Sequence, residues 1–87
     1  MRYPLLALMF ATISGASLAG ADCPKHPKNE WMPQAKAKQQ IEALGYKIKK
    51  FKVDGECYEI YGSNKEGKRA EVYFDTKTLA VVKAEID

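Results

Sequence analysis

The stretch from Gly45 to Ile86, GYKIKKFKVDGECYEIYGSNKEGKRAEVYFDTKTLAVVKAEI, decides the fold of this 87-residue chain. Apolar and polar residues alternate in four runs, and short turn signals at 54–55, 64–67 and 75–79 separate these runs. Alternation with a period of two is typical of β-strands that bury one face. The stretch therefore predicts a four-stranded antiparallel β-meander.

The first hairpin is predicted from its turn. Asp54-Gly55 favours a type I′ turn with these two residues at its centre, which places Phe51 opposite Tyr58 on one face. The apolar residues before Phe51 are out of phase with it. One extra residue restores their face, so we predict a β-bulge at 49–50.

The other two turns predict the remaining registers. The segment 64–67 suits a type I turn followed by Gly67 with a positive φ angle. The segment 75–79 would close in the same way and would place Leu79 at a position suited to positive φ, which costs a non-glycine residue some energy. The predicted partners are Tyr58 with Phe74, Ile60 with Val72, Val82 with Val72, and Ala84 with Ala70.

These registers divide the sheet into two faces. The predicted inner face carries Phe51, Val53, Tyr58, Ile60, Ala70, Val72, Phe74, Ala80, Val82, Ala84 and Ile86. The predicted outer face carries Cys57, Glu59, Tyr61, Arg69, Glu71, Tyr73, Val81, Lys83 and Glu85. Tyrosines among alternating charges are typical of ordinary cross-strand pairs on a solvated face, where carboxylates are unperturbed, and also of recognition surfaces. The candidate partner-binding residues are Glu59, Tyr61, Arg69, Glu71 and Tyr73.

Residues 33–44 predict a helix that covers the inner face. Proline is favoured at the first helical position, the residues after it are strong helix formers, and Gly45 is suited to a left-handed C-terminal cap. Ala37, Ile41 and Leu44 recur at helical spacing and form one apolar stripe. The expected fold is α+β, with one N-terminal helix packed on the four-stranded meander (αββββ).

Two other features keep two readings each. Trp31 precedes the helix and either closes one end of the core or is an exposed anchor for a partner; the core is favoured. The run Lys47–Lys52 is either a polyanion site or a charged edge strand that discourages aggregation, which is favoured. The net charge of +3 is too small to indicate nucleic-acid binding.

The N-terminal residues 1–21 resemble a secretory signal peptide. Arg2 supplies a positive charge, Leu5–Ile13 is apolar, and Ala19 and Ala21 are small residues at the two positions that determine cleavage after Ala21. Cleavage after Ala19 is the second possibility. The apolar run is shorter than the about 20 residues of a membrane span, so no stable membrane insertion is expected after cleavage. The predicted organisation is a signal peptide at 1–21, an N-terminal arm at 22–30 and one domain at 31–87.

The two cysteines, Cys23 and Cys57, both follow the predicted leader. An even count in an exported chain predicts one disulfide, here closing a loop of about 35 residues and contributing roughly 4 kcal/mol in the chain-entropy model. Asp22 stands where a lipoprotein signal has a small residue, which argues against lipidation of Cys23. His26, the only histidine, is expected to be exposed and incidental, with metal ligation as the weaker alternative.

The chain lacks the motifs of an enzyme. No phosphate-binding glycine loop or zinc-protease motif is present, and no nucleophile has a base partner in the sequence. We therefore predict no catalytic residues, no metal site and no cofactor.

The sequence resembles the PepSY domain family, and in particular its small secreted single-domain members. The resemblance runs from Trp31 to Ile86, and Cys23 near the expected mature N-terminus also fits the short members. Its motif residues are Trp31, Gly45-Tyr46, Cys57-Tyr58-Glu59 and Glu71-Val72-Tyr73. The segment 75–79 departs from the family, because it lacks the proline and glycine of the usual Asp-Pro-x-Thr-Gly turn.

The resemblance implies a non-enzymatic binding module. PepSY domains occur in propeptides of secreted metallopeptidases and as lone secreted domains, and their proposed role is to inhibit or regulate a protein partner. For this chain the expectation is a periplasmic module that regulates a peptidase or an envelope sensor, through the tyrosine-bearing face or an exposed sheet edge. The alternative is a small-ligand or metal-ion binding protein of the cell envelope that uses His26 and surface carboxylates.

Overall fold

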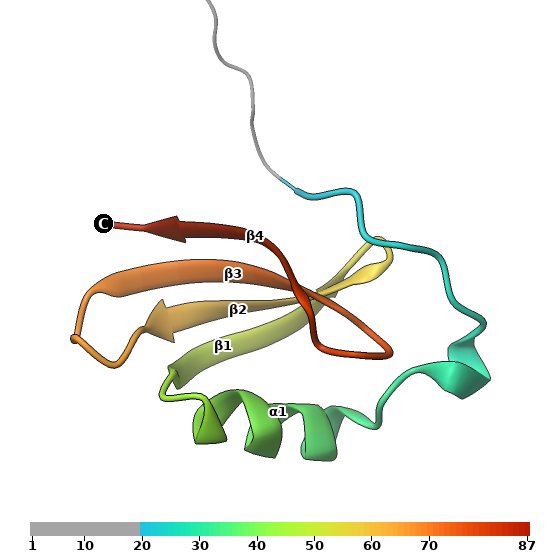
Figure 1. The fold of residues 1–87 in the computed structure, drawn as a ribbon, viewed down its shortest axis with the longest axis horizontal. Coiled ribbons are helices and arrows are strands. Elements are labelled where there is room, and N and C mark those ends of the chain that lie inside the picture. Colours follow the sequence, from blue (N-terminus) through green and yellow to red (C-terminus); the bar gives the residue numbers. More distant parts are fainter. Residues whose placement is uncertain (1–19) are drawn as a thin grey trace, which may run out of the picture.

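A computed structural model describes residues 20–87 (Figure 1). The predicted signal peptide lies outside the described residues, except for Gly20 and Ala21. In chain order the elements are η2 (Lys28–Glu30), α1 (Gln34–Ala43), β1 (Lys47–Asp54), β2 (Cys57–Ser63), β3 (Arg69–Asp75) and β4 (Val81–Ile86). No helix within the described range is both long and apolar enough to cross a membrane.

The four strands form one antiparallel sheet in the order β1-β2-β3-β4, so β1 and β4 are its edges. Helix α1 lies beside β1 and covers the inner face, and the N-terminal arm runs along the opposite side of the sheet (Figure 1). This arrangement confirms the predicted α+β meander with one N-terminal helix. The lysine-rich run is an edge strand, as favoured.

The hairpin of β1 and β2 has the predicted bulge but not the predicted turn. The register shifts between Ile48 and Lys50. Phe51 pairs with Ile60 rather than with Tyr58. The two central turn residues are 55 and 56, and Gly55 adopts φ +61°, as the first central residue of a type II′ turn does. A shift of two residues keeps every side chain on its face, so the predicted faces survive the error.

The hairpin of β2 and β3 matches the prediction throughout. Tyr58 pairs with Phe74, and Ile60 pairs with Val72. The turn is fixed by the Asn64 side chain, whose Oδ1 accepts hydrogen bonds from two backbone N–H groups at 3.0 and 2.9 Å. This turn therefore sets the register of the central strand pair.

The hairpin of β3 and β4 departs from the predicted register. Val72 pairs with Ala84 rather than with Val82, and a second bulge leaves Val82 without a partner, so Val81, which was predicted on the outer face, lies opposite Phe74. Leu79 has φ +65°, as predicted for its position in the turn. Its side chain is buried in the core, while Ala80, which was predicted to face inward, is exposed. The loop is longer than predicted, and its extra length places the Leu79 side chain in the core.

The core lies between α1 and the first three strands. Its buried members are Ala37, Ile41, Tyr58, Ile60, Ala70, Val72, Phe74 and Leu79. The predicted helix stripe is correct for Ala37 and Ile41 but wrong for Leu44, whose side chain is 55 % exposed. Val53, Val82 and Ile86, which were predicted to face inward, are also exposed, because α1 does not reach the ends of β1 or strand β4.

The segment before the helix closes one end of the core. Pro33 precedes α1 as its N-cap, one residue outside the predicted position. Trp31 packs against the core and contacts the Tyr58 ring edge-on at a centroid distance of 5.6 Å. The Tyr58 hydroxyl donates to the Met32 carbonyl at 2.6 Å. The core role favoured for Trp31 is confirmed.

Gly62 permits the backbone of β1 to approach β2 unusually closely. A Cβ atom placed on Gly62 would lie 1.8 Å from the carbonyl oxygen of Lys47, far inside any tolerated contact. Gly62 pairs with Ile48 at the start of the bulge. The bulge therefore depends on the missing side chain at this position.

Candidate functional site

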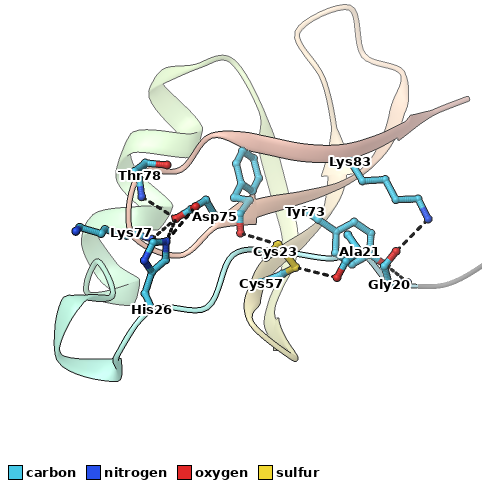
Figure 2. The surroundings of a disulfide bond; sticks show 11 residues. Gly20, Ala21, Cys23, His26, Cys57, Tyr73, Asp75, Lys77, Thr78 and Lys83 are labelled. Atoms are coloured by element: carbon cyan, nitrogen blue, oxygen red, sulfur yellow. Dashed lines mark hydrogen bonds and ion pairs between the residues drawn. A yellow bond between two sulfur atoms is a disulfide. The ribbon is translucent and has the colours of Figure 1, made fainter.

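A disulfide fastens the N-terminal arm to the outer face of the sheet (Figure 2). Cys23 and Cys57 are joined with a Cα–Cα distance of 5.4 Å, which confirms the predicted bridge. Cys57 is fully buried at the start of β2. Its side chain points to the outer face, so the bridge holds residues 20–26 over that face.

On one side of the bridge the arm brings His26 to Asp75. His26 Nε2 lies 3.0 Å from Asp75 Oδ1 and 3.1 Å from Oδ2 (Figure 2). Because a carboxylate only accepts hydrogen bonds, Nε2 is the protonated nitrogen. The expectation of an exposed, incidental histidine is therefore wrong. The His26 carbonyl also accepts a hydrogen bond from Trp31 Nε1 at 2.9 Å, which links the arm to the core.

Asp75 organises the β3–β4 turn. Burial acts to raise the pKa of Asp75, but hydrogen bonds from His26 and from the Lys77 and Thr78 N–H groups outweigh it, so the pKa lies below its ordinary value. Its Oδ1 accepts from the Lys77 N–H at 2.7 Å and from the Thr78 N–H at 3.1 Å. The ionised side chain thus holds the turn and the arm together.

We expect this carboxylate to make the domain sensitive to acid. Because the folded pKa of Asp75 is depressed, its contribution is complete above the unfolded pKa of about 4 and is lost as the pH falls through the lower folded value. Asp75→Asn should reduce stability at pH 7 and flatten the loss below pH 4, measured by urea unfolding across that range. Asp22→Asn, at an exposed carboxylate, is the matched control. An unchanged pH profile in Asp75→Asn would contradict this role.

On the other side of the bridge the arm covers two of the predicted partner-binding residues. Glu59 is 1 % exposed and Tyr73 is 2 % exposed, and the two pair across β2 and β3. The Gly20 N–H donates to the Tyr73 hydroxyl at 3.0 Å, and that hydroxyl donates to Glu71 Oε2 at 2.9 Å. The predicted solvated face is therefore closed at Glu59 and Tyr73.

Glu59 and Glu71 form a coupled carboxyl pair. Burial raises the pKa of Glu59, and hydrogen bonding to Glu71 raises it further. The pKa of Glu71 is lowered, first by the hydrogen bond with Glu59 and also by Tyr73 and Tyr61. When the pair carries one proton, Glu59 holds it and Glu71 is the ionised member. The predicted unperturbed carboxylates are wrong for both positions.

Tyr61 and Arg69 are the accessible part of the predicted face. Tyr61 is 38 % exposed, and the ammonium groups of Lys50 and Lys52 lie 5.9 and 5.5 Å from its ring centroid. Hydrogen bonding to Glu71, before the smaller effect of burial, raises the pKa of Tyr61 to about 12. Arg69 donates to the Asp87 carboxylate at 2.6 Å. These residues border an open hollow of about 540 Å³ lined by Lys47, Ile48, Lys49, Tyr61, Gly62, Ser63, Gly67 and Arg69.

The opposite edge of the sheet carries several exposed apolar side chains. In the described part of the chain, β4 pairs with β3 alone. Val81, Val82 and Ile86 are exposed along it, and Leu44 is exposed at the end of α1. Leu44, Val81 and Ile86 border a second hollow of about 400 Å³. An unpaired strand with exposed apolar side chains is suited to accept an extended segment of another protein.

The described residues do not assemble a metal centre. Between residues 20 and 87, no group of three or more His, Cys, Asp or Glu side chains lies close enough to hold an ion. His26, on which the metal alternative depended, has Asp75 as its acidic neighbour.

Comparison with known families identifies the domain. The PepSY family described as "Peptidase propeptide and YPEB domain" matches residues 4–85. The chain belongs to this family. The PepSY resemblance carried by the motif residues is thereby confirmed, while the narrower secreted single-domain type stays a prediction. No curated protein and no solved structure matches this PepSY chain significantly.

Proposed function

We propose that this PepSY domain is a non-catalytic periplasmic module that binds and regulates a peptidase. The family description, which joins the domain to peptidase propeptides, supports the class of partner. The predicted leader and the disulfide support an oxidising compartment outside the cytoplasm. The proposal retains the expected role and commits to one partner.

The open edge of β4 carries this proposal. Main-chain groups on an unpaired edge can hydrogen bond to an extended segment, and side chains beside the edge give specificity. Here the side chains of Val81 and Ile86 are exposed and line the same hollow as Leu44, so a strand added to β4 would gain an apolar floor. The peptidase segment that binds should therefore be extended and apolar on alternate residues.

An inhibition assay tests the proposal. The mature, oxidised protein is titrated against the peptidases secreted by its source organism, and the inhibition constant is measured for each. We expect Val81→Lys/Ile86→Lys to weaken inhibition at least about tenfold, which corresponds to about 1.4 kcal/mol. Tyr61→Ala/Arg69→Ala, on the other face, is the matched control and should stay within about twofold of wild type, a change of well under 1 kcal/mol.

The outcomes separate the alternatives. A loss confined to Tyr61→Ala/Arg69→Ala moves the binding site to the tyrosine-bearing face. Inhibition of no peptidase by the wild-type protein overturns the proposed partner. All four side chains are exposed, so each variant should keep the thermal midpoint of wild type. Thermal unfolding of each variant checks that weaker inhibition does not result from unfolding.

A further inference from the structure

The backbone of Gly20 is held on the outer face by the side chains of Tyr73 and Lys83, beside the Glu59–Glu71 carboxyl pair. The Gly20 N–H reaches the Tyr73 hydroxyl, and the Gly20 carbonyl accepts a hydrogen bond from Lys83 Nζ at 3.1 Å (Figure 2). Both backbone polar groups of Gly20 are therefore engaged by side chains of the sheet. Such engagement is unusual for a residue expected to be discarded with a leader.

The site holds more acceptor capacity than one amide N–H uses. Within residues 20–87, Glu59 Oε2 is buried and has no hydrogen-bond partner. A buried oxygen without a donor costs free energy, so it indicates a missing donor. Two hydrogen bonds in series, through the Tyr73 hydroxyl, connect the Gly20 nitrogen to the ionised carboxylate of Glu71. A group with several N–H donors and a positive charge would complete the site.

The sequence offers such a group at this position. Ser17 and Ala19 are small residues at the two positions that determine cleavage after Ala19, the alternative to cleavage after Ala21. Hydrolysis of the Ala19–Gly20 bond consumes one water and leaves a carboxylate on Ala19 and an α-amino group on Gly20. Cleavage after Ala21 would instead remove the residue that occupies the site.

We propose that the exported chain is cleaved between Ala19 and Gly20 and that the new α-ammonium group of Gly20 binds the Tyr73–Glu71–Glu59 cluster. The ammonium carries three N–H donors where the amide carries one, so two further donors become available to the carboxyl pair. The proposal rests on the export proposed above. It moves the start of the mature arm from residue 22 to residue 20.

Charges from every neighbouring strand face this site. Asp54 lies beside it, because a Cβ placed on Gly20 would be 3.7 Å from Asp54 Oδ2. Lys52 Nζ lies 3.9 Å from Glu59 Oε1. The titratable groups around the site are Lys52 and Asp54 from β1, Glu59 and Tyr61 from β2, Glu71 and Tyr73 from β3, and Lys83 from β4. A bound ammonium can displace the proton that Glu59 holds, and the three carboxylates then exceed the two lysines by one negative charge, which the ammonium balances.

The first experiment reads the cleavage position directly. The full chain is expressed with its own leader in a bacterial host, and the exported protein is analysed by intact mass spectrometry and N-terminal sequencing. A mature start at Gly20 is expected. A start at Asp22, or at any other residue, overturns the proposal. An uncleaved chain overturns the export proposal as well, so the two failures are distinguishable.

The second experiment tests the ammonium contact in a folded protein. Protein beginning at Gly20 is compared with the same protein acetylated at its α-amino group, which keeps an N–H but removes the charge. We expect acetylation to lower the thermal midpoint by about 5 °C, which is the scale of one lost charge contact in a domain of this size. In Glu71→Gln, acetylation should have little effect, since the carboxylate that binds the charge is gone.

An NMR titration supplies an independent reading of the same contact. The α-amino pKa of Gly20 should lie roughly one unit above the usual value of about 7.7–8.0 and should fall back in Glu71→Gln. A Gly20 pKa at the usual value in wild type, or equal effects of acetylation in both backgrounds, overturns binding of the ammonium. Neither reading depends on a partner protein.

Discussion

Replacing both bridge residues, in Cys23→Ser/Cys57→Ser, is expected to lower the free energy of unfolding by about 4 kcal/mol. The bridge joins residues 34 apart in sequence, and the chain-entropy model assigns that value to a loop of this length. A small domain has a marginal core and little total stability, so this is a large share of what it has. Urea unfolding of the variant and of oxidised wild type measures the difference.

Two controls keep this result interpretable. Wild type reduced with a thiol also lacks the bridge, so its free energy of unfolding should agree with that of the double variant. Release of the arm should also expose Tyr73, whose pKa is raised mainly by burial, and a spectrophotometric titration should then show one more tyrosine ionising near its ordinary pKa of about 10. A difference under about 1 kcal/mol would contradict the bridge as the main fastening of the arm.

The second large effect is expected from Gly62→Ala, which should destabilise the domain by about 3 kcal/mol or more. The added Cβ would stand 1.8 Å from the Lys47 carbonyl oxygen, so β1 must move away from β2. This movement relieves the clash, but it also breaks hydrogen bonds between β1 and β2 at the bulge, and their loss destabilises the domain. Equilibrium urea unfolding gives the magnitude, and amide exchange along β1 shows whether the strand opens at that end.

Gly67→Ala is the matched control for this substitution. Gly67 has φ +81° but a Cβ placed there meets nothing within 4 Å, so its cost is backbone strain of about 1–2 kcal/mol. Gly62 does not have a φ angle in that range, and its cost is steric. We therefore expect the glycine with the ordinary backbone angle to be the less replaceable. The opposite order of destabilisation would show that β1 yields easily.

The sequence predicted the sheet faces more reliably than the registers. Alternation with a period of two indicates which face a side chain occupies until a bulge interrupts it, as at Val82, but it cannot distinguish registers that differ by two residues. The Asn64 turn has side-chain hydrogen bonds that specify its geometry, and the register it sets was predicted correctly. Asp54-Gly55 is compatible with two positions of the first turn. In the last turn, burial of the Leu79 side chain in the core is accompanied by a register that differs from the predicted one.

The predicted site failed where the arm covers it. Glu59 and Tyr73 were placed on the correct face, yet periodicity contains no information on what crosses that face. The missing step was available from the cysteines: with Tyr58 opposite Phe74, Cys57 lies opposite Asp75. A bridge from Cys23 then brings His26 within reach of Asp75. The polar, proline-rich composition of the arm favoured a solvated segment instead.

The unpaired β4 strand makes binding of a partner depend on the concentration of the protein itself. An edge that can accept a strand from a partner presents the same main-chain groups to β4 of a second copy. A partner must therefore compete with self-association, and its advantage grows as the protein becomes more dilute. Abundance of the domain, as well as affinity, would then decide how much of the edge is available for regulation.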